Sequence, residues 1–129
     1  MAVIKYMLDT NICIYLIKKH PPKIVAKFDN YRRGEICISS ITWAELCCGI
    51  KKDGDGITEQ LLNILAVVPF GVEEGRIFGK LNELLPNRKA NLDRMIAAHA
   101  LSLGVTLVTN NPADFEAYKL AGLVLENWT

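Results

Sequence analysis

The chain lacks a hydrophobic run long enough to cross a lipid bilayer. Its longest nearly apolar stretch, residues 60–72, is interrupted by Asn63, Pro69 and Gly71, whereas a membrane-spanning helix needs about 20 consecutive apolar residues. The sequence also has no basic N-terminal segment followed by an apolar stretch and a small-residue cleavage site, so a secretory signal peptide is not indicated. We therefore expect a cytoplasmic protein that makes no membrane contact.

Cysteine-based metal-binding signatures and nucleotide-binding signatures are absent as well. The four cysteines are Cys13, Cys37, Cys47 and Cys48, and none of them forms a C-x-x-C pair of the kind found in zinc sites and redox motifs. We expect all four to be reduced and to pack as small hydrophobic side chains. No P-loop or G-x-G-x-x-G motif occurs, so a nucleotide cofactor is not indicated.

A large charge of one sign is also absent. The 15 Lys and Arg residues nearly balance the 14 Asp and Glu residues, which gives a formal net charge of +1. Net charge alone therefore gives no argument for a nucleic-acid or membrane partner. The 129 residues fit one domain spanning 1–129. Half of the residues are hydrophobic, which is apolar for a small domain and suggests that a partner covers part of the surface.

Short apolar runs alternate with segments of helical periodicity along the whole chain. The predicted strands are residues 4–8, 35–39, 66–70, 105–109 and 123–125. The predicted helices are residues 11–19, 23–30, 42–51, 57–65, 73–85 and 92–103. This alternation is typical of βαβ units, so the sequence predicts an α/β fold with a parallel sheet and helices on both faces.

Four carboxylates lie near the predicted ends of these strands. Asp9 ends the first strand, and Glu45 lies one turn into the helix after the second. Asp114 follows the fourth strand, and Asp93 begins the helix that precedes it. Ligands of open α/β sheets bind at the carboxyl ends of the strands. The sequence therefore predicts an acidic site at that edge.

Each acid also has an ordinary structural interpretation. Glu45 lies three residues after Thr42, which is the spacing of a helix capping box. Asp93 and Asp114 fall in the first turns of predicted helical segments, where an acid suits the helix dipole, and Asp9 can cap the helix that follows it. These interpretations and the acidic site are not mutually exclusive.

Clustered carboxylates favour a bound cation. Like charges repel, and each acid is costly to desolvate unless a cation lies among them. Oxygen ligands without His or Cys favour Mg²⁺ or Mn²⁺, and such an ion can hold a phosphodiester and activate water. The neighbouring cations Arg88, Lys89 and Arg94 are candidates for contacts with the phosphates of a bound nucleic acid.

Four motifs occur in order along the chain: residues 8–11 (LDTN), 39–46 (SSITWAEL) with Gly49, 93–100 (DRMIAAHA) and 109–115 (TNNPADF). Together they resemble the motifs of PIN domains, and more narrowly those of VapC-type toxins of bacterial toxin–antitoxin pairs. The resemblance extends from Tyr6 to Trp128.

The resemblance implies a three-layer α/β/α PIN-like fold with a central, mostly parallel sheet, and a metal-dependent endoribonuclease activity. It makes Asp9 and Asp93 direct ligands of Mg²⁺ or Mn²⁺. Glu45 and Asp114 then act on the metal directly or through water. One position departs from the pattern, because residue 111 is often acidic in such toxins and is Asn here.

The resemblance also assigns supporting residues and partners. Asn11, Ser40 and Thr109 match polar positions that orient the acids or bind metal-associated water. The implied substrate is RNA, with transfer RNA and its initiator species as the target. The implied partners are a cognate antitoxin, which relieves growth arrest, and a second copy of the chain in a homodimer.

Two non-nuclease interpretations remain as alternatives. One is a non-catalytic module, either a PIN-like scaffold or a receiver-like phosphoacceptor, that binds RNA or protein. A receiver needs paired acids after its first strand, and Asp9 has no acidic neighbour. The other is a phosphatase with an Asp-x-Asp nucleophile, in which Asn11 occupies the place of the second acid.

His99 lies on an apolar helical stripe and is expected to be structural.

Overall fold

The strands of the central sheet are short and run in the same direction. The computed structural model of this protein describes residues 3–49, 55–86 and 92–129. The five-stranded sheet is parallel throughout and has the order β3-β2-β1-β4-β5. The strands are β1 (Tyr6–Leu8), β2 (Ile36–Ser39), β3 (Ala66–Val68), β4 (Thr106–Val108) and β5 (Leu125–Glu126).

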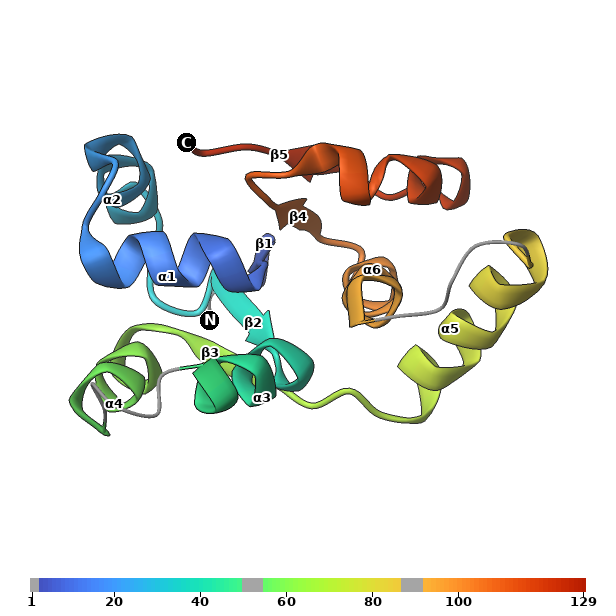
Figure 1. The fold of residues 1–129 in the computed structure, drawn as a ribbon, viewed down its shortest axis with the longest axis horizontal. Helices are drawn as coiled ribbons and strands as arrows, with labels where there is room; N and C mark the ends of the chain where they lie inside the picture. Colours follow the sequence, from blue (N-terminus) through green and yellow to red (C-terminus); the bar gives the residue numbers. More distant parts are fainter. Residues whose placement is uncertain (1–2, 50–54, 87–91) are drawn as a thin grey trace.

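Helices cover both faces of this sheet, as the sequence predicts (Figure 1). The helices of the described residues are α1 (Thr10–Lys18), α2 (Pro22–Asp29), α3 (Ser40–Gly49), α4 (Asp55–Ile64), α5 (Val72–Leu84) and α6 (Leu92–Leu103), with 3₁₀ helices η1 (Pro112–Asp114) and η2 (Glu116–Ala121). In Figure 1, α5 lies outside α6 on one side of the strands, and α1 and α2 lie on the other side. The predicted three-layer α/β/α architecture is confirmed.

Alternating side chains of the strands divide the interior into two cores. On β1, Met7 joins a core with α5, α6, η2 and Phe115, while Leu8 joins a second core with α1, α2 and α4. On β4, Leu107 belongs to the first core and Val108 to the second. Each such side chain contributes roughly 1.5–3 kcal/mol when it is fully buried. The period-2 geometry of a strand therefore fixes which helices lie on each face.

Helix α3 starts two residues earlier than the sequence predicts. It begins at Ser40, directly after β2, and Ser39 Oγ accepts a hydrogen bond of 3.0 Å from the amide of Ile41. Thr42 is therefore already inside the helix, and the side chain of Glu45 bonds elsewhere. The predicted capping box is wrong, because the serines that end β2 take over the start of the helix.

The C-terminal part of the chain also differs from the prediction. Residues 116–121 form η2, which the sequence analysis left without an element, and the last strand lies at Leu125–Glu126 rather than at 123–125. Leu123 lies in the loop before β5 but is only 4% exposed. Because this buried loop residue is apolar, the sequence of the loop resembles that of a strand. Short 3₁₀ helices carry too few turns for helical periodicity to reveal them.

The cysteines divide into two pairs. Cys13 and Cys37 are buried and reduced, as predicted. Cys47 and Cys48 are reduced but exposed on α3, so their predicted burial is wrong.

No helix in the described part of the chain has the length and apolar character needed to span a membrane.

Arg94 is buried in the interior of the protein and does not face a potential RNA ligand. It is 1% exposed, and its guanidinium donates hydrogen bonds to the Asn82 side chain, the Leu85 carbonyl oxygen and the Tyr118 hydroxyl. It also lies over the ring of Tyr118, 6.0 Å from its centroid. The prediction that Arg94 contacts RNA is therefore wrong. The other two predicted contacts, Arg88 and Lys89, lie outside the described residues.

His99 connects α6 to the carboxyl end of β2. Its ring is fully buried, and Nδ1 lies 2.8 Å from Ser39 Oγ. The edge of the ring meets Phe70 with 5.7 Å between centroids. In the described part of the chain, Nε2 has no hydrogen-bond partner. Burial lowers the pKa of His99 below its ordinary value of 6.5, and Glu74 opposes this shift.

Replacing Arg94 with Lys should destabilise the fold. An ammonium group cannot reproduce the fork of guanidinium hydrogen bonds, so at least one buried acceptor loses its partner. We expect the free energy of unfolding to fall by about 1–3 kcal/mol, measured by urea denaturation. Arg76, an exposed arginine on α5, provides the matched control. Equal effects of Arg94→Lys and Arg76→Lys would contradict the structural role of Arg94.

Acidification should weaken the fold through His99. Because the folded state favours the neutral ring, the unfolded chain takes up a proton first as the pH falls below about 6.5, and the free energy of unfolding decreases. We expect His99→Asn to reduce this loss between pH 7 and pH 5 in thermal melts. His20 is the other histidine of the chain and is exposed. His20→Asn should leave the pH dependence unchanged.

Candidate active site

All four predicted acids line one cavity at the carboxyl ends of the strands. The cavity has a volume of about 150 Å³ and is lined by Asp9, Thr10, Asn11, Glu45, Asp93, Ile96, Asn111, Asp114 and Phe115. These residues come from the start of α1, from α3, from the start of α6 and from the segment after β4. Segments that are distant in the sequence therefore converge on one acidic cavity.

Asp9 lies at the junction of β1 and α1. Its Oδ1 accepts a hydrogen bond of 3.2 Å from the amide of Ile12, so it caps α1 as well as lining the cavity. Its Oδ2 accepts a hydrogen bond of 2.6 Å from the hydroxyl of Thr109, which follows β4. Asp9 is 8% exposed. These contacts fix both carboxylate oxygens at the cavity wall.

The pKa of Asp9 reflects this burial. Desolvation raises the pKa above its ordinary value of 3.8, and the nearby charge of Glu45 acts in the same direction. The hydroxyl of Thr109 and the backbone amides of Ile12 and Asn11 oppose the increase. Asp9 is therefore a carboxylate whose negative charge is only partly compensated by the protein around it.

Glu45 is held by a residue from a different helix. Its Oε1 accepts a hydrogen bond of 2.8 Å from the hydroxyl of Thr10 at the start of α1. Thr10 is next to Asp9, so the contact fixes the acid of α3 beside the acid of β1. The role of Thr10 is not among the predictions from the sequence, where the available signal is its position between Asp9 and Asn11.

Asn111 connects the acid of η1 to the network around Asp9. Its side-chain amide donates a hydrogen bond of 2.8 Å to Asp114 Oδ2, and its backbone amide donates one of 3.0 Å to Thr109 Oγ1. The same Thr109 oxygen donates to Asp9. The amide at position 111 thus positions Asp114 without adding another negative charge.

Asp93 completes the acidic wall above an apolar floor. It is half-buried in the first turn of α6. Ile96, one turn further along α6, and Phe115 also line the cavity, and each is 2% exposed. Apolar walls lower the local dielectric constant, so charges in the cavity interact more strongly with each other and with a cation than they would in water.

The predicted supporting residues take different positions. Asn11 lines the cavity, and its amide lies 3.4 Å from Asn110 Oδ1. Thr109 lies behind Asp9 and bonds to it. Ser40 is not part of the cavity lining; its Oγ accepts a hydrogen bond of 3.0 Å from the amide of Phe70. Ser40 therefore connects the start of α3 to the segment after β3.

The chemistry of the donor set fits a hydrated divalent cation. The ionisable groups that line the cavity are carboxylates, which suit Mg²⁺ and Mn²⁺. Among residues 3–49, 55–86 and 92–129, no three acidic, His or Cys side chains converge tightly enough to form a complete ligand cluster. Mg²⁺ does not need such a cluster, because it usually retains several waters and binds one or two carboxylates directly.

The topology places this cavity where ligands of α/β proteins usually bind. The chain continues from β1 to β2 on one side, while β4 and β5 extend the sheet on the other side of β1. Asp9 follows β1 and Thr109 follows β4, so their contact spans the point at which the strand order reverses. Crevices at such switch points hold ligands in open α/β sheets.

Comparison with known proteins agrees with this fold and site. The PIN domain family matches residues 6–120. Ribonuclease VapC2 of Haemophilus influenzae is 38% identical, with 98% of this chain and 99% of the relative covered. The tRNA(fMet)-specific endonuclease VapC of Shigella flexneri is 34% identical and covers 98% of this chain and 100% of its own.

A solved structure gives the same result. The crystal structure of VapBC2 from Rickettsia felis, bound to a DNA fragment from its promoter, contains a chain that is 34% identical to this one. The two superpose with a TM-score of 0.85, with 98% of this chain and 100% of the other covered. This chain therefore belongs to the PIN domain family, and within it to the VapC group.

Proposed function

We propose that this protein is a metal-dependent endoribonuclease toxin that cleaves RNA and arrests growth unless an antitoxin binds it. The observation that carries the proposal is the convergence of four carboxylates, from four separate segments, on one cavity at the carboxyl edge of the sheet. The ribonuclease names of the VapC relatives support the same reaction class.

Within this proposal, Asp9 and Asp93 hold the cation directly, while Glu45 and Asp114 act directly or through water. A bound Mg²⁺ or Mn²⁺ would supply Lewis-acid chemistry, because it would polarise a phosphoryl oxygen and neutralise charge that develops during cleavage. The partly uncompensated charge of Asp9 supports its assignment as a ligand.

The residues of the chain would then orient the reactants. The hydroxyl groups of Thr109 and Thr10 fix the carboxylates of Asp9 and Glu45. A carboxylate held in this way can orient an attacking water and accept its proton. Ile96 and Phe115, each 2% exposed, contribute the apolar part of the cavity lining.

Transfer RNA is the substrate that the relatives suggest. A relative that aligns over almost its whole length is named a tRNA(fMet)-specific endonuclease. A backbone phosphate in a loop of such an RNA can reach a concave acidic site more easily than one inside a regular duplex, because single-stranded segments can splay apart.

An antitoxin and a second copy of the chain are the proposed protein partners. The VapBC2 structure supports the antitoxin, since it pairs a related VapC chain with VapB. An arginine from the antitoxin could bind among the four carboxylates. Exposed apolar side chains on several elements are available to a homodimer; they include Val72, Leu84, Leu92 and Leu120.

The receiver-like alternative is not supported by the topology. Receiver-type sheets have the strand order 2-1-3-4-5, whereas this sheet has the order β3-β2-β1-β4-β5. The phosphatase alternative is weakened by Asn11, whose exposed amide contacts Asn110 rather than supplying a second acid.

Replacing Asp9 with Asn should abolish RNA cleavage without unfolding the protein. The substitution removes a negatively charged metal ligand but keeps the side-chain shape and an oxygen that can cap α1. We expect cleavage of a transfer RNA to fall at least about 100-fold, while the free energy of unfolding changes by less than about 1 kcal/mol. Gel analysis of the RNA and a thermal melt would measure the two effects.

The matched control for Asp9→Asn is Glu83→Gln, which neutralises an exposed acid on α5. This variant should cleave RNA like the wild type. Equal cleavage by wild type and Asp9→Asn would contradict the proposed site, as would growth arrest that persists when Asp9→Asn is expressed without antitoxin.

Metal binding should be measurable independently of activity. A cation that binds only the folded state relieves repulsion among the carboxylates and should stabilise the fold by about 2.7 kcal/mol at 100 times its dissociation constant. Thermal melts with Mg²⁺, Mn²⁺ or EDTA would reveal this shift. Asp93→Asn should reduce it, and EDTA should stop cleavage. A melting temperature that does not change on addition of either Mg²⁺ or Mn²⁺ would contradict the metal site.

A further inference from the structure

The balanced net charge of the chain conceals a strongly basic segment. Residues 18–33 contain six Lys or Arg residues and one Asp, while the rest of the chain contains nine Lys or Arg residues against thirteen acids. This segment comprises the end of α1, the whole of α2 and the turn before β2. A positive surface of this kind attracts polyanions.

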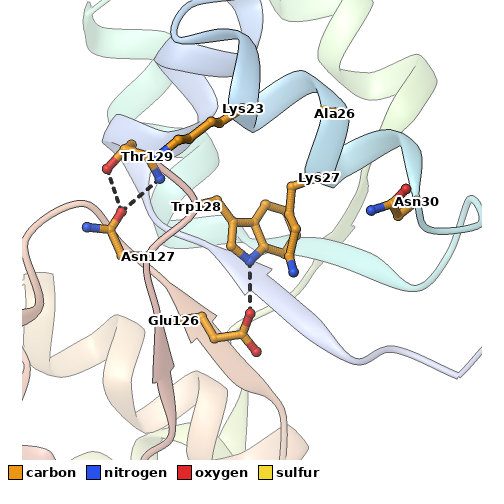
Figure 2. Close-up of a pocket in the computed structure, with 8 residues that line it drawn as sticks. All are labelled: Lys23, Ala26, Lys27, Asn30, Glu126, Asn127, Trp128 and Thr129. Atoms are coloured by element: carbon orange, nitrogen blue, oxygen red, sulfur yellow. Dashed lines mark hydrogen bonds between the residues drawn. The ribbon is translucent and has the colours of Figure 1, made fainter.

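A groove lies beside this segment, between α2 and the residues that follow β5 (Figure 2). Its volume is about 380 Å³, and it is lined by Lys23, Ala26, Lys27, Asn30, Glu126, Asn127, Trp128 and Thr129. The ion pairs found among the described residues involve neither Lys23 nor Lys27. Among the residues that the structure describes, two ammonium groups therefore border the groove with no carboxylate neutralising them in an ion pair.

The carboxylate of the groove has other partners. Glu126 Oε1 accepts a hydrogen bond of 3.1 Å from the indole nitrogen of Trp128, which Figure 2 also shows. Trp128 is 4% exposed and packs on the rings of Tyr6 and Tyr31. The indole is thus a fixed wall of the groove, and Glu126 is held against it.

Polar side chains extend from the acidic cavity along α1 toward the basic segment. From Asn11 at the cavity, contacts run to Asn110 at 3.4 Å and from Asn110 to the hydroxyl of Tyr15 at 3.0 Å. Tyr15 lies one turn before the basic end of α1. Asn127 follows Glu126, which pairs with Val108 beside this path. The nine residues of α1 span roughly 13 Å along the helix axis.

We propose that the groove bordered by Lys23 and Lys27 binds backbone phosphates of the RNA substrate, away from the bond that is cleaved. This inference rests on the proposed ribonuclease function. RNA leaving the cavity would pass Asn11, Asn110 and Tyr15 and then place phosphates against the two lysines. The amide and hydroxyl groups of Asn30, Asn127 and Thr129 can bond to phosphate or sugar oxygens.

The lining of the groove favours RNA over an acidic protein segment. A protein segment usually gains much of its affinity by inserting apolar or aromatic anchors into a pocket. Here the large aromatic side chain, Trp128, is already buried against Tyr6 and Tyr31, and the other lining residues are polar or charged apart from Ala26. Lysine ammonium groups in a polar groove suit repeated phosphates instead.

The test compares Lys23→Gln/Lys27→Gln with the wild type. Binding of an initiator transfer RNA transcript is measured by fluorescence anisotropy in EDTA at several KCl concentrations, so that no cleavage occurs. Losing two phosphate contacts should reduce the slope of log affinity against log salt by about 1.4 to 1.8, and the affinity by about tenfold at 0.1 M salt. In Mg²⁺, KM should rise while kcat stays nearly constant.

The matched control is Lys80→Gln/Lys119→Gln, which removes two charges from α5 and η2 on the other face of the sheet. It should leave the salt slope unchanged, and thermal melts should show both double variants folded. Equal slopes for the groove and control variants would overturn the inference. Unchanged RNA affinity together with weaker binding of a polyglutamate peptide would also overturn it, by assigning the groove to an acidic protein segment.

The experiments distinguish failure of the groove inference from failure of the proposed ribonuclease function. If the groove variant binds RNA like the wild type while Mg²⁺-dependent cleavage still requires Asp9, the nuclease stands and the groove inference fails. If the groove variant loses RNA binding but no preparation cleaves RNA, the groove stands as an RNA-binding surface and the proposed nuclease fails. Absence of RNA binding by the wild type would overturn the groove inference.

Discussion

The repulsion between carboxylates at the carboxyl edge of the sheet is the constraint on which the candidate site depends. Four acids line about 150 Å³, above a floor made by Ile96 and Phe115. Two apolar cores, one on each face of the sheet, hold the elements that carry these acids. The free energy of those cores maintains an arrangement that the charges alone would not favour.

Neutral donors hold Asp9, Glu45 and Asp114 in place without cancelling their charge. Hydroxyl groups from Thr10 and Thr109 and an amide from Asn111 each donate to a carboxylate. In the described part of the chain, the ion pairs Lys5–Glu35, Arg76–Glu73 and Lys119–Glu116 do not involve Asp9, Glu45 or Asp114. A site fixed by neutral groups keeps its attraction for an external cation, whereas internal salt bridges would reduce it.

The sequence was sufficient for the features that depend on local pattern. Apolar runs located the strands, and the alternation of strands and helices located the acids at one edge, because parallel strands end together. Contacts between distant segments were not accessible in this way. The bond from Thr10 to Glu45 joins residues 35 positions apart. The burial of Arg94 depends on partners in α5 and η2, and the charge pattern around Asp93 suggested a surface position instead.

The division of the cysteines gives the protein two classes of thiol. Cys13 and Cys37 are buried, and burial raises the pKa of Cys37 to about 12 and that of Cys13 further still. Both therefore stay protonated and inaccessible to electrophiles. Cys47 and Cys48 are exposed on α3, the helix that carries Glu45. A maleimide fluorophore should therefore label α3 selectively in the native chain and place a probe within one turn of an acid of the cavity.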